Sequence, residues 1–259
     1  MMYAEKIASQ HNQEHFCLFD IDVDNISMSQ SIDWIVDHSK QDRISVVSFV
    51  NAHNLNQVCE KMDYKESIQH SDLILPDGSG VKLASMINGV ALKENINGTD
   101  MLPFLCDAMS EESIPVFLLG AKPGVAIAMA KKLEAEYKNL NVVGCAHGYF
   151  EENKTGQVIN QINRSGAKVL LVAMGTPAQE IWIDRHKSLL MPNVIIGVGG
   201  LFDFYSGRIP RAPKYLRRIG CEWVWRLIQE PSRMWRRYIL GNPLFIARVL
   251  LAIGNRRSQ

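Results

Sequence analysis

The chain has 259 residues, enough for one α/β domain with an appendage and for a sizeable buried core. A hydrophobic fraction of 47% excludes general disorder, and five scattered cysteines without a CxxC pair exclude a disulfide framework and favour a reducing cytoplasm. The net charge of +1 conceals an asymmetry, because residues 208–259 hold 12 Lys and Arg against two acids while residues 1–207 carry −9. Such an asymmetry indicates an anionic partner, either a membrane or a nucleic acid.

The N-terminal residues 1–14 are polar and lack the apolar stretch of a signal peptide. No run of 18 or more apolar residues occurs, so we expect that no segment spans a bilayer and that any membrane contact is peripheral. The seven histidines show neither HxxxH nor HExxH spacing, and we expect no protein-bound metal.

The first elements are a strand over 16–24, where apolar and polar residues alternate, and a helix to about Lys40 that Ser27 and Gln30 open as a capping box. Apolar runs then alternate with helical patterns. Strands are predicted at 44–50, 72–76, 115–120, 141–146, 167–175 and 193–199. Helices are predicted from about 54, at 80–87, from 99 to before 115, from 123 to about 137, at 155–164 and from 177 to about 190. This order predicts a Rossmann-like, mostly parallel sheet covered by helices on both faces.

After Arg208 the strand pattern ends. Helical pieces follow, punctuated by Pro210, Pro213, Pro231 and Pro243. The sequence therefore predicts two parts: an α/β body over residues 1–207 and a basic helical appendage over residues 208–259.

Polar residues follow two predicted strands at their carboxyl ends, where sheets of this kind bind ligands. Asn51 closes the run 44–50, and its side chain can bind a sugar or base or, alternatively, cap the next helix. Asp77 closes the run 72–76 beside Gly78, which lets a ligand approach the backbone. A carboxylate here suits a general base that removes the proton of an acceptor hydroxyl, with an ordinary turn aspartate as the alternative.

Glycine-containing turns follow the last two predicted strands. Gly175 and Thr176 lead into a helix N-terminus, whose free N–H groups and dipole favour a phosphate. Thr176 fits an N-cap and Gln179 fits a capping-box residue, which is the alternative role for this glutamine. In the second turn Gly199 permits close backbone approach, and Asp203 is placed to accept a hydrogen bond from a ribose or sugar hydroxyl. Neither turn is a Walker loop or a GxGxxG fingerprint.

Three alternating acids, Asp20, Asp22 and Asp24, suggest either a metal-binding DxD motif or the start of a dehalogenase-like phosphatase. The alternation of the predicted strand 16–24 places all three on one solvated face, which is the simpler interpretation.

The appendage interleaves arginines with large aromatic residues: Arg226, Arg233, Arg236 and Arg237 with Trp223, Trp225, Trp235 and Tyr238. Trp and Tyr favour the headgroup level of a membrane and arginines pair with phosphates, each basic residue contributing about 1 kcal/mol near an anionic surface. A solvated basic face over core tryptophans is the alternative. Nucleic acid is the rival partner, but the apolar end, Leu244 to Ile253, fits lipid better.

Taken in order, several motifs resemble the WecG/TagA/CpsF family of bacterial glycosyltransferases over about residues 18–245. The matching pieces are VNA at 50–52, DLILPDGSG at 72–80, NGTD at 97–100, FLLG at 117–120, GCAHGYF at 144–150, MGTPAQE at 174–180, GVGGLFD at 197–203 and the stretch from Arg211 to Arg233. Each motif alone is weak, and the ordered set is specific.

The resemblance implies an inverting, metal-independent and cofactor-free transfer from a UDP-sugar to a polyprenyl-pyrophosphate-linked sugar. The product would feed a bacterial surface polysaccharide, made at the inner face of the plasma membrane. It also implies a Rossmann-like body whose C-terminal appendage can complete the active site, often in a homo-oligomer. Nucleic acid is then not expected as a partner.

The resemblance also implies roles for single residues. Asp77 becomes the general base, Asn51 and Gln179 hold the sugar or the reacting groups, and Asp203 helps to hold the nucleotide. The arginines expected at the pyrophosphates and the membrane are Arg226, Arg233, Arg236 and Arg237. The further nucleotide or substrate contacts expected from the matched turns are Gly78, Thr99, Gly120, Gly175, Thr176 and Gly199.

Two positions depart from the family pattern. Phe49 stands where the family often has Thr, and Asn95 stands where it often has Arg. Both bear on the donor contacts, and the neutral Asn95 leaves more phosphate charge to the appendage arginines or to helix N-termini. Besides the phosphatase, a membrane-recruited nucleotide-binding adaptor without catalysis is the remaining alternative.

Overall fold

The computed structural model describes residues 15–218 and 220–257, so the polar segment 1–14 lies outside the described residues. Six parallel strands form one sheet in the order β4-β3-β8-β7-β5-β6. The strands are β3 (Ser45–Val50), β4 (Leu73–Pro76), β5 (Val116–Gly120), β6 (Val142–Ala146), β7 (Val169–Ala173) and β8 (Val194–Gly197). Each lies within a predicted run, which confirms the α/β, Rossmann-like fold class.

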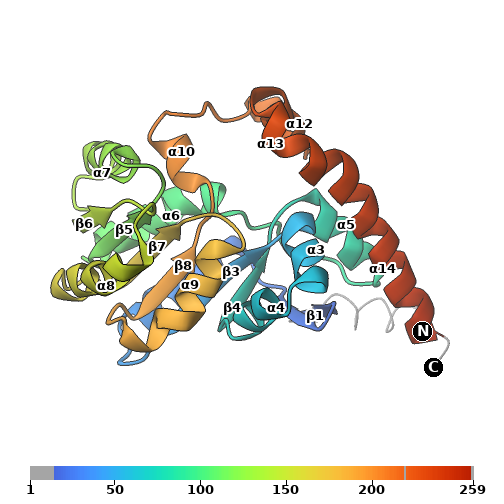
Figure 1. The fold of residues 1–259 in the computed structure, drawn as a ribbon, viewed down its shortest axis with the longest axis horizontal. Helices are drawn as coiled ribbons and strands as arrows, with labels where there is room; N and C mark the ends of the chain where they lie inside the picture. The colour runs from blue at the N-terminus through green and yellow to red at the C-terminus, as the bar shows by residue number, and fades with distance from the viewer. Residues whose placement is uncertain (1–14, 219, 258–259) are drawn as a thin grey trace.

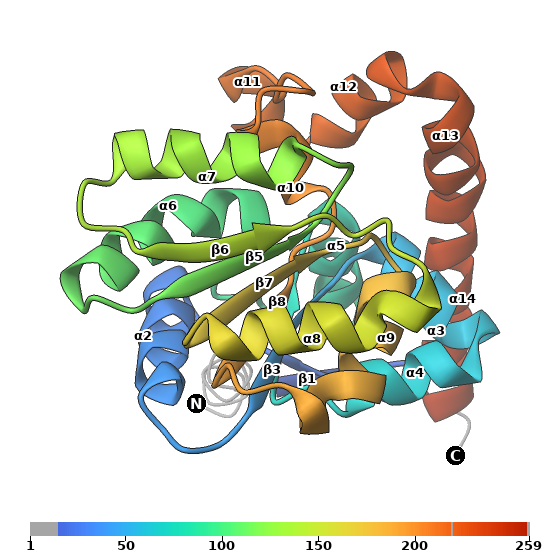
Figure 2. The same ribbon diagram turned by 60° about the vertical axis from the view of Figure 1, so that its left-hand side comes forward.

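Helices cover both faces of this sheet (Figures 1 and 2). One face packs on α2 (Met28–Ser39), α6 (Gly98–Glu111), α7 (Val125–Glu136) and α10 (Leu201–Tyr205). The other packs on α3 (Ala52–Glu60), α4 (Met62–Gln69), α5 (Ser79–Ile87), α8 (Thr155–Arg164) and α9 (Ala178–His186). On β3, Val47 and Phe49 point to the first face and Val46 and Val50 to the second. Continuous apolar runs therefore encode strands that are buried on both sides.

The predicted strand over 16–24 is wrong, because the chain reverses within it. His15–Leu18 (β1) and Ile21–Asp24 (β2) form an antiparallel hairpin, a two-stranded sheet of its own. Its turn residues Phe19 and Asp20 have φ of 54° and 63°. Left-handed conformations are uncommon without glycine, so the alternating pattern ran through the turn and concealed it.

Helix starts were predicted well where a side chain caps the backbone. Ser27 forms the expected capping box with Gln30 ahead of α2, and α6, capped by Asn97, begins at Gly98, one residue before the predicted start. The N-cap assigned to Thr176 is wrong, because α9 begins after Pro177 without a side-chain cap. The Thr176 hydroxyl instead donates a hydrogen bond to a buried carboxylate, described below.

The appendage is helical, as predicted. It contains α11 (Lys214–Arg218), α12 (Glu222–Gln229), α13 (Pro231–Trp235), a π-helical turn (Arg236–Leu240) and α14 (Gly241–Arg257). Pro231 takes the first helical position of α13. Pro243, which was expected to interrupt the helix, lies inside a continuous one. Pro243 is the third residue of α14, directly after the π turn, and in the first turn of a helix the missing N–H of a proline costs little.

Helix α14 lies along α3 and α5 at the β4 side of the sheet (Figure 1). Phe245 and Val249 are buried in the same apolar cluster as Leu55 and Val81. The Arg248 guanidinium donates hydrogen bonds of 3.0 Å to the backbone and side-chain oxygens of Asn56 and of 3.0 Å to Glu60. Apolar burial and charge-assisted hydrogen bonds thus fix the appendage to the body of the same chain.

One continuous helical stretch, Pro231–Gly254, is long and apolar enough to cross a bilayer by length and composition, and 11% of its most apolar window is buried within the chain. The sequence expectation rested on uninterrupted apolar runs, and arginines interrupt this stretch. Its mean hydropathy nevertheless stays as high as that of a membrane-spanning helix. Exposed apolar side chains along it are Ile239, Leu240, Leu244, Leu250 and Leu251.

Candidate active site

The carboxylate of Asp77 lies directly after β4, at the carboxyl edge of the sheet. The neighbouring strand β3 ends at Val50, and the backbone N–H of Asp77 donates to the Val50 carbonyl at 2.8 Å, which extends the parallel pairing by one residue. The Asn51 amide then donates to Asp77 Oδ2 at 3.3 Å. The two residues predicted at these strand ends are therefore brought together.

The protein environment makes Asp77 a stronger base than an ordinary aspartate. Burial raises its pKa from 3.8 to about 6, while the hydrogen bond from Asn51 and the positive charge of Arg237 act to lower it. A carboxyl whose pKa lies near neutrality can both exist as carboxylate and accept a proton. Such perturbed groups at strand ends are typical of functional sites.

The helix-cap interpretation of Asn51 is confirmed, and the same side chain also contacts Asp77. Its side-chain oxygen accepts from the N–H groups of His53 and Asn54, so it caps α3, while its amide nitrogen serves Asp77. Asn95, the departure from the family pattern, also has a structural role. Its oxygen accepts the Gly78 N–H at 2.6 Å, which holds the turn beside Asp77 in place.

The two glycine turns are joined by the side chain of Gln179. Its oxygen accepts hydrogen bonds from the N–H of Gly175 at 3.2 Å and from that of Gly199 at 3.0 Å. Both glycines have left-handed φ, 80° and 59°, which a residue with a Cβ adopts with strain. Gln179 is 2% exposed. Its oxygen thus ties the end of β7 to the end of β8, a role that the capping-box alternative did not foresee.

The other predicted nucleotide contacts have partners inside the protein. The Asp203 carboxylate forms an ion pair with Arg208 at 2.7 Å, and the Thr99 carbonyl accepts the Tyr205 hydroxyl at 3.0 Å. Gly120 has a φ of 148°, and a Cβ there would lie 2.4 Å from the Ala173 carbonyl oxygen. A glycine at 120 is therefore needed for the close approach of β5 and β7.

Two of the four appendage arginines that were predicted at the pyrophosphates and the membrane point inward. Arg226 lies with its guanidinium 4.8 Å from the centre of the Phe204 ring, and a Cβ added to Gly200 would be 3.0 Å from its Nη2. Its Nε is buried without a hydrogen-bond partner, and so is the Nε of Arg237, whose charge acts on Asp77. These inward arginines bring positive charge to the ends of β4 and β8.

The other two arginines point outward. Arg233 is 60% exposed and pairs with Glu230 at 3.2 Å, and Arg236 is exposed beside the Trp235 ring at 5.3 Å. Trp235 is itself exposed. The basic group predicted as one set is thus divided between the site and the outer surface.

The alternating acids of the N-terminal hairpin are not part of this site. Asp20 is in the hairpin turn and pairs with Lys65 at 2.7 Å, and Asp22 is exposed. Asp24 accepts the Ile74 N–H at 2.6 Å, so it joins the hairpin to β4. They lie in a separate antiparallel sheet, whereas a dehalogenase-like nucleophile would follow a strand of the parallel sheet.

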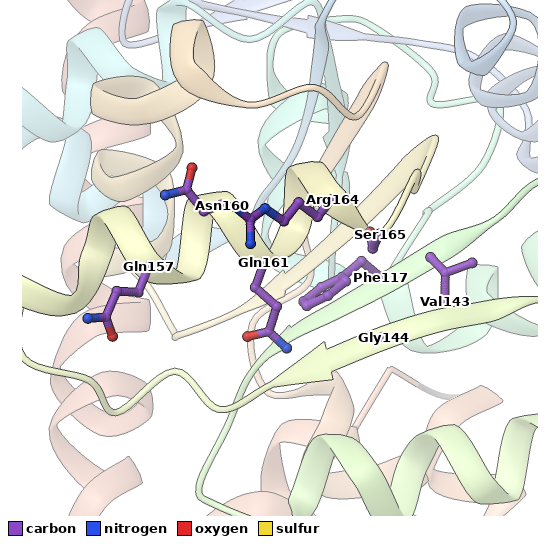
Figure 3. Close-up of a pocket in the computed structure, with 8 residues that line it drawn as sticks. All are labelled: Phe117, Val143, Gly144, Gln157, Asn160, Gln161, Arg164 and Ser165. Atoms are coloured by element: carbon purple, nitrogen blue, oxygen red, sulfur yellow. The ribbon is translucent and has the colours of Figure 1, made fainter.

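A surface cavity of about 520 Å³ lies elsewhere, between β6 and α8 (Figure 3). Gln157, Asn160, Gln161 and Arg164 of α8 line one side of it, and Phe117 lies at its base. None of the residues predicted at the strand ends borders this cavity. Its position separates it from the group around Asp77.

The fold and the site together define a doubly wound α/β protein with a basic carboxylate at a strand end and arginines supplied by a C-terminal appendage. The chain belongs to the WecG/TagA/CpsF family of glycosyl transferases, whose sequence pattern matches residues 16–259. This membership confirms the resemblance, and the chain is therefore of the glycosyltransferase class.

Two relatives are similar over most of their length. The N-acetylglucosaminyldiphosphoundecaprenol N-acetyl-beta-D-mannosaminyltransferase of Bacillus subtilis (strain 168) is 33% identical over 235 residues, 90% of each chain. The protein of the same name from Bacillus spizizenii (strain ATCC 23059 / NRRL B-14472 / W23) is 33% identical over 187 residues, 72% of this chain and 71% of its own.

Sequence reasoning missed Glu180, which follows Gln179 in the matched motif. It is a buried carboxylate at 4% exposure that accepts hydrogen bonds from Gln179 and Thr176. A charged residue in the first turn of a helix usually faces solvent, where the helix dipole favours it, so the pattern gave no sign of its burial.

Proposed function

We propose that this chain transfers a sugar, with inversion, from a UDP-sugar to a sugar carried on a polyprenyl pyrophosphate, in the synthesis of a bacterial surface polysaccharide. The observation that carries the proposal is the Asp77 carboxylate, partly buried at a strand end with a pKa of about 6 and hydrogen-bonded to Asn51. The relatives' names support the acceptor class, since they describe an N-acetylglucosamine carried on undecaprenyl diphosphate. They also make N-acetylmannosamine the first donor sugar to test.

In the proposed step, Asp77 takes the proton from the acceptor hydroxyl as that oxygen attacks the anomeric carbon. The new carbon–oxygen bond forms on the face opposite the bond that breaks, and UDP leaves with the electron pair. Asn51 holds the carboxylate in orientation through its amide N–H. General base catalysis of this kind contributes about 10²–10⁴-fold in rate.

The departing diphosphate needs positive charge, which we assign to Arg226 and Arg237. Both have a buried Nε without a hydrogen-bond partner, and burial lowers the pKa of Arg226. A phosphate oxygen would satisfy such donors with charge-assisted hydrogen bonds. The turns at Gly175 and Gly199 lie at the same edge of the sheet. On this basis we propose a metal-independent reaction, in which arginines stabilise the charge that develops on the diphosphate.

We further propose that the appendage holds the enzyme at the inner face of the plasma membrane. Its exposed apolar side chains lie on the same helical stretch as the outward Arg233 and Arg236. Apolar contact together with attraction to anionic headgroups is the combination that binds peripheral helices to bilayers. A lipid-linked acceptor would then reach the inward arginines from the membrane side.

A donor panel tests the proposed activity. Purified full-length chain is mixed with N-acetylglucosaminyl-pyrophosphoryl-polyprenol and with UDP-linked N-acetylmannosamine, N-acetylmannosaminuronic acid or glucose, and the lipid product is followed by mass spectrometry. We expect one donor to give a disaccharide-lipid. UDP binding without product from any donor would instead support the nucleotide-binding adaptor.

Metal independence has its own test. Transfer measured in EDTA should equal transfer in Mg²⁺ to within about twofold, because arginines take the place of the cation. Loss of activity in EDTA, restored by Mg²⁺, would contradict this part of the proposal and leave the transfer reaction standing.

A further inference from the structure

The carboxylate of Glu180 is the least expected charge in the body. It lies in the first turn of α9 and is buried, and both of its hydrogen bonds go to one oxygen. Oε1 accepts from Gln179 Nε2 at 2.8 Å and from the Thr176 hydroxyl at 3.0 Å, while Oε2 has no hydrogen-bond partner. A buried carboxylate is costly to the fold, so its contacts need a role other than stability.

The first contact fixes the orientation of the Gln179 amide. A carboxylate only accepts hydrogen bonds, so the NH₂ group must face Glu180 and the carbonyl oxygen must face away. That oxygen is then available to both glycine N–H groups, of Gly175 and of Gly199. If the amide turned over, its NH₂ would meet two other donors. Glu180 therefore sets how the turns after β7 and β8 are held together.

The second contact leads toward the proposed base. Thr176 Oγ1 donates to Glu180 and accepts from Asn54 Nδ2 at 3.0 Å. The Asn54 side-chain oxygen in turn accepts the backbone N–H of Asn51 at 3.3 Å, and the side-chain amide of Asn51 donates to Asp77 at 3.3 Å. Because each hydroxyl and amide has one orientation that satisfies its neighbours, an acceptor at position 180 favours one orientation of Thr176 and Asn54, and Asn54 in turn holds the backbone of the residue that contacts Asp77.

We propose that Glu180 is a positioning residue for sugar transfer. Its carboxylate orients two parts of the site relative to one another: the strand ends that carry Asn51 and Asp77, and the turns at Gly175 and Gly199. This inference rests on the proposed function, in which the base and the diphosphate-binding turns must act on one donor molecule. Misplacement of reacting groups by about 1 Å can cost on the order of 10²-fold in rate. Glu180 itself touches no substrate in this scheme.

The first test is Glu180→Gln, which keeps the shape of the side chain. A glutamine can offer its oxygen to the two donors only by burying its NH₂ at the Oε2 position, where no acceptor lies, so the side chain is driven to turn or shift and no longer fixes the Gln179 amide. We expect kcat to fall about 10- to 100-fold. The amide resonances of Gly175 and Gly199 should shift in ¹⁵N-glycine spectra of the free protein while those of glycines outside the strand-end turns stay in place.

The control is Asn193→Ala. Asn193 is also buried, has one hydrogen-bonded and one unpartnered side-chain atom, and lies before β8, at the opposite end of that strand from Gly199. It should lower the melting temperature and leave both kcat and the Gly175 and Gly199 resonances unchanged. If Asn193→Ala lowers kcat as much as Glu180→Gln does, the effect is general destabilisation and the positioning role is overturned.

The coupling to Gln179 separates positioning from an independent effect. If Glu180 acts partly through Gln179, the double variant Gln179→Ala with Glu180→Gln loses at least fivefold less activity than the product of the two single losses. Losses that multiply would overturn the inference, since independent contributions are additive in free energy.

Failure of this inference is distinguishable from failure of the proposed function. Unshifted glycine resonances, or normal transfer by Glu180→Gln beside an inactive Asp77→Asn, overturn the positioning role alone. Absence of transfer by the unaltered chain with every donor removes the proposed function, and the glycine spectra still decide what Glu180 orients.

Discussion

The amide side chains at the strand ends of the body and the inward arginines of the appendage differ in whether their buried hydrogen-bonding groups have partners. At the strand ends of the body, Asn51, Asn54 and Gln179 satisfy one another or the backbone. At the inner face of the appendage, Arg226 and Arg237 each keep a buried N–H without a partner. The body is therefore organised before any ligand arrives, whereas the appendage presents donors that an anion would complete.

This difference suggests a division of labour. A base and its supporting hydrogen bonds must keep one geometry, and buried networks provide that rigidity. The arginines that bind the diphosphate lie on the appendage, a separate element. This element can move enough to let the acceptor enter and UDP leave. Each prediction below changes one region and asks whether the other is affected.

The largest effect is expected from Asp77→Asn in the body. The amide cannot accept the proton, so kcat should fall about 10²–10⁴-fold while the affinity for UDP, measured by calorimetry, stays within about threefold. Near-normal transfer by this variant would show that another group is the base and that the body supplies only binding.

The same variant should be more stable than the natural chain above pH 6. Folding raises the Asp77 pKa from 3.8 to about 6, so the native state loses relative stability as the pH rises across that interval. Asp77→Asn removes this cost, and we expect a gain of about 1–3 kcal/mol at pH 8 that disappears near pH 4. Urea unfolding at both pH values measures it.

Arg237→Gln should be the strongest single change in the appendage. Removing a buried cation from the diphosphate site should lower kcat/KM about 10²-fold, in the range seen when one transition-state donor is lost. Arg43→Gln is the matched control, because that arginine pairs with Asp72 near the opposite edge of the sheet. Equal losses in both variants would mean that net charge, and not the site, is responsible.

The pH profile links the two regions directly. As the base must be ionised, kcat/KM should rise tenfold per pH unit below about 6 and level off above it. The Arg237 charge lowers the Asp77 pKa, so Arg237→Gln should move the midpoint to higher pH. A midpoint that stays fixed would show that the appendage does not act on the base.

A smaller effect is expected at the outer surface. Leu240→Glu with Leu251→Glu places two acids on the exposed apolar residues of the appendage. Sedimentation with anionic liposomes should fall about five- to tenfold, because both apolar contact and charge are lost, while transfer to a short-chain soluble acceptor persists. Unchanged liposome binding with an altered oligomeric state would identify this surface as a contact between copies of the chain.

The smallest change is expected from Arg248→Ala at the junction. Loss of its hydrogen bonds to Asn56 and Glu60 should lower stability by about 1–3 kcal/mol, seen as a drop of a few degrees in Tm. Activity should fall only in proportion to the fraction of molecules in which α14 is detached from the body. A drop in Tm without loss of transfer would show that Phe245 and Val249 suffice to dock it.

The sheet was predictable because its strands are buried on both faces and appear as continuous apolar runs, as in β7 and β8. The hairpin was not, because Phe19 and Asp20 take left-handed conformations without glycine. The break at Lys61 between α3 and α4 was missed for a similar reason, since no Gly or Pro marks it.

Within the site, it was easier to predict which residues lie there than which residues they contact. Asp77 and Asn51 were found because residues after parallel strands converge at one edge. The joining role of Gln179 and the burial of Glu180 depend on contacts to residues 20 or more positions away or on packing, which local pattern does not contain. The division of the arginines into inward and outward pairs likewise follows from how α14 docks.

The π turn over Arg236–Leu240 has a consequence for how this chain can vary. A turn of this kind holds one residue more than an α-helical turn, so it rotates everything before it by roughly 100° against the helix that follows. Deleting Leu240 would convert the π turn to a regular α-helical turn and rotate Arg237 away from Asp77. Phe245 would stay in the apolar cluster that it forms with α3 and α5. One residue inserted or deleted in this turn therefore changes the rotation of Arg237 about the helix axis relative to the residues that dock α14 on the body.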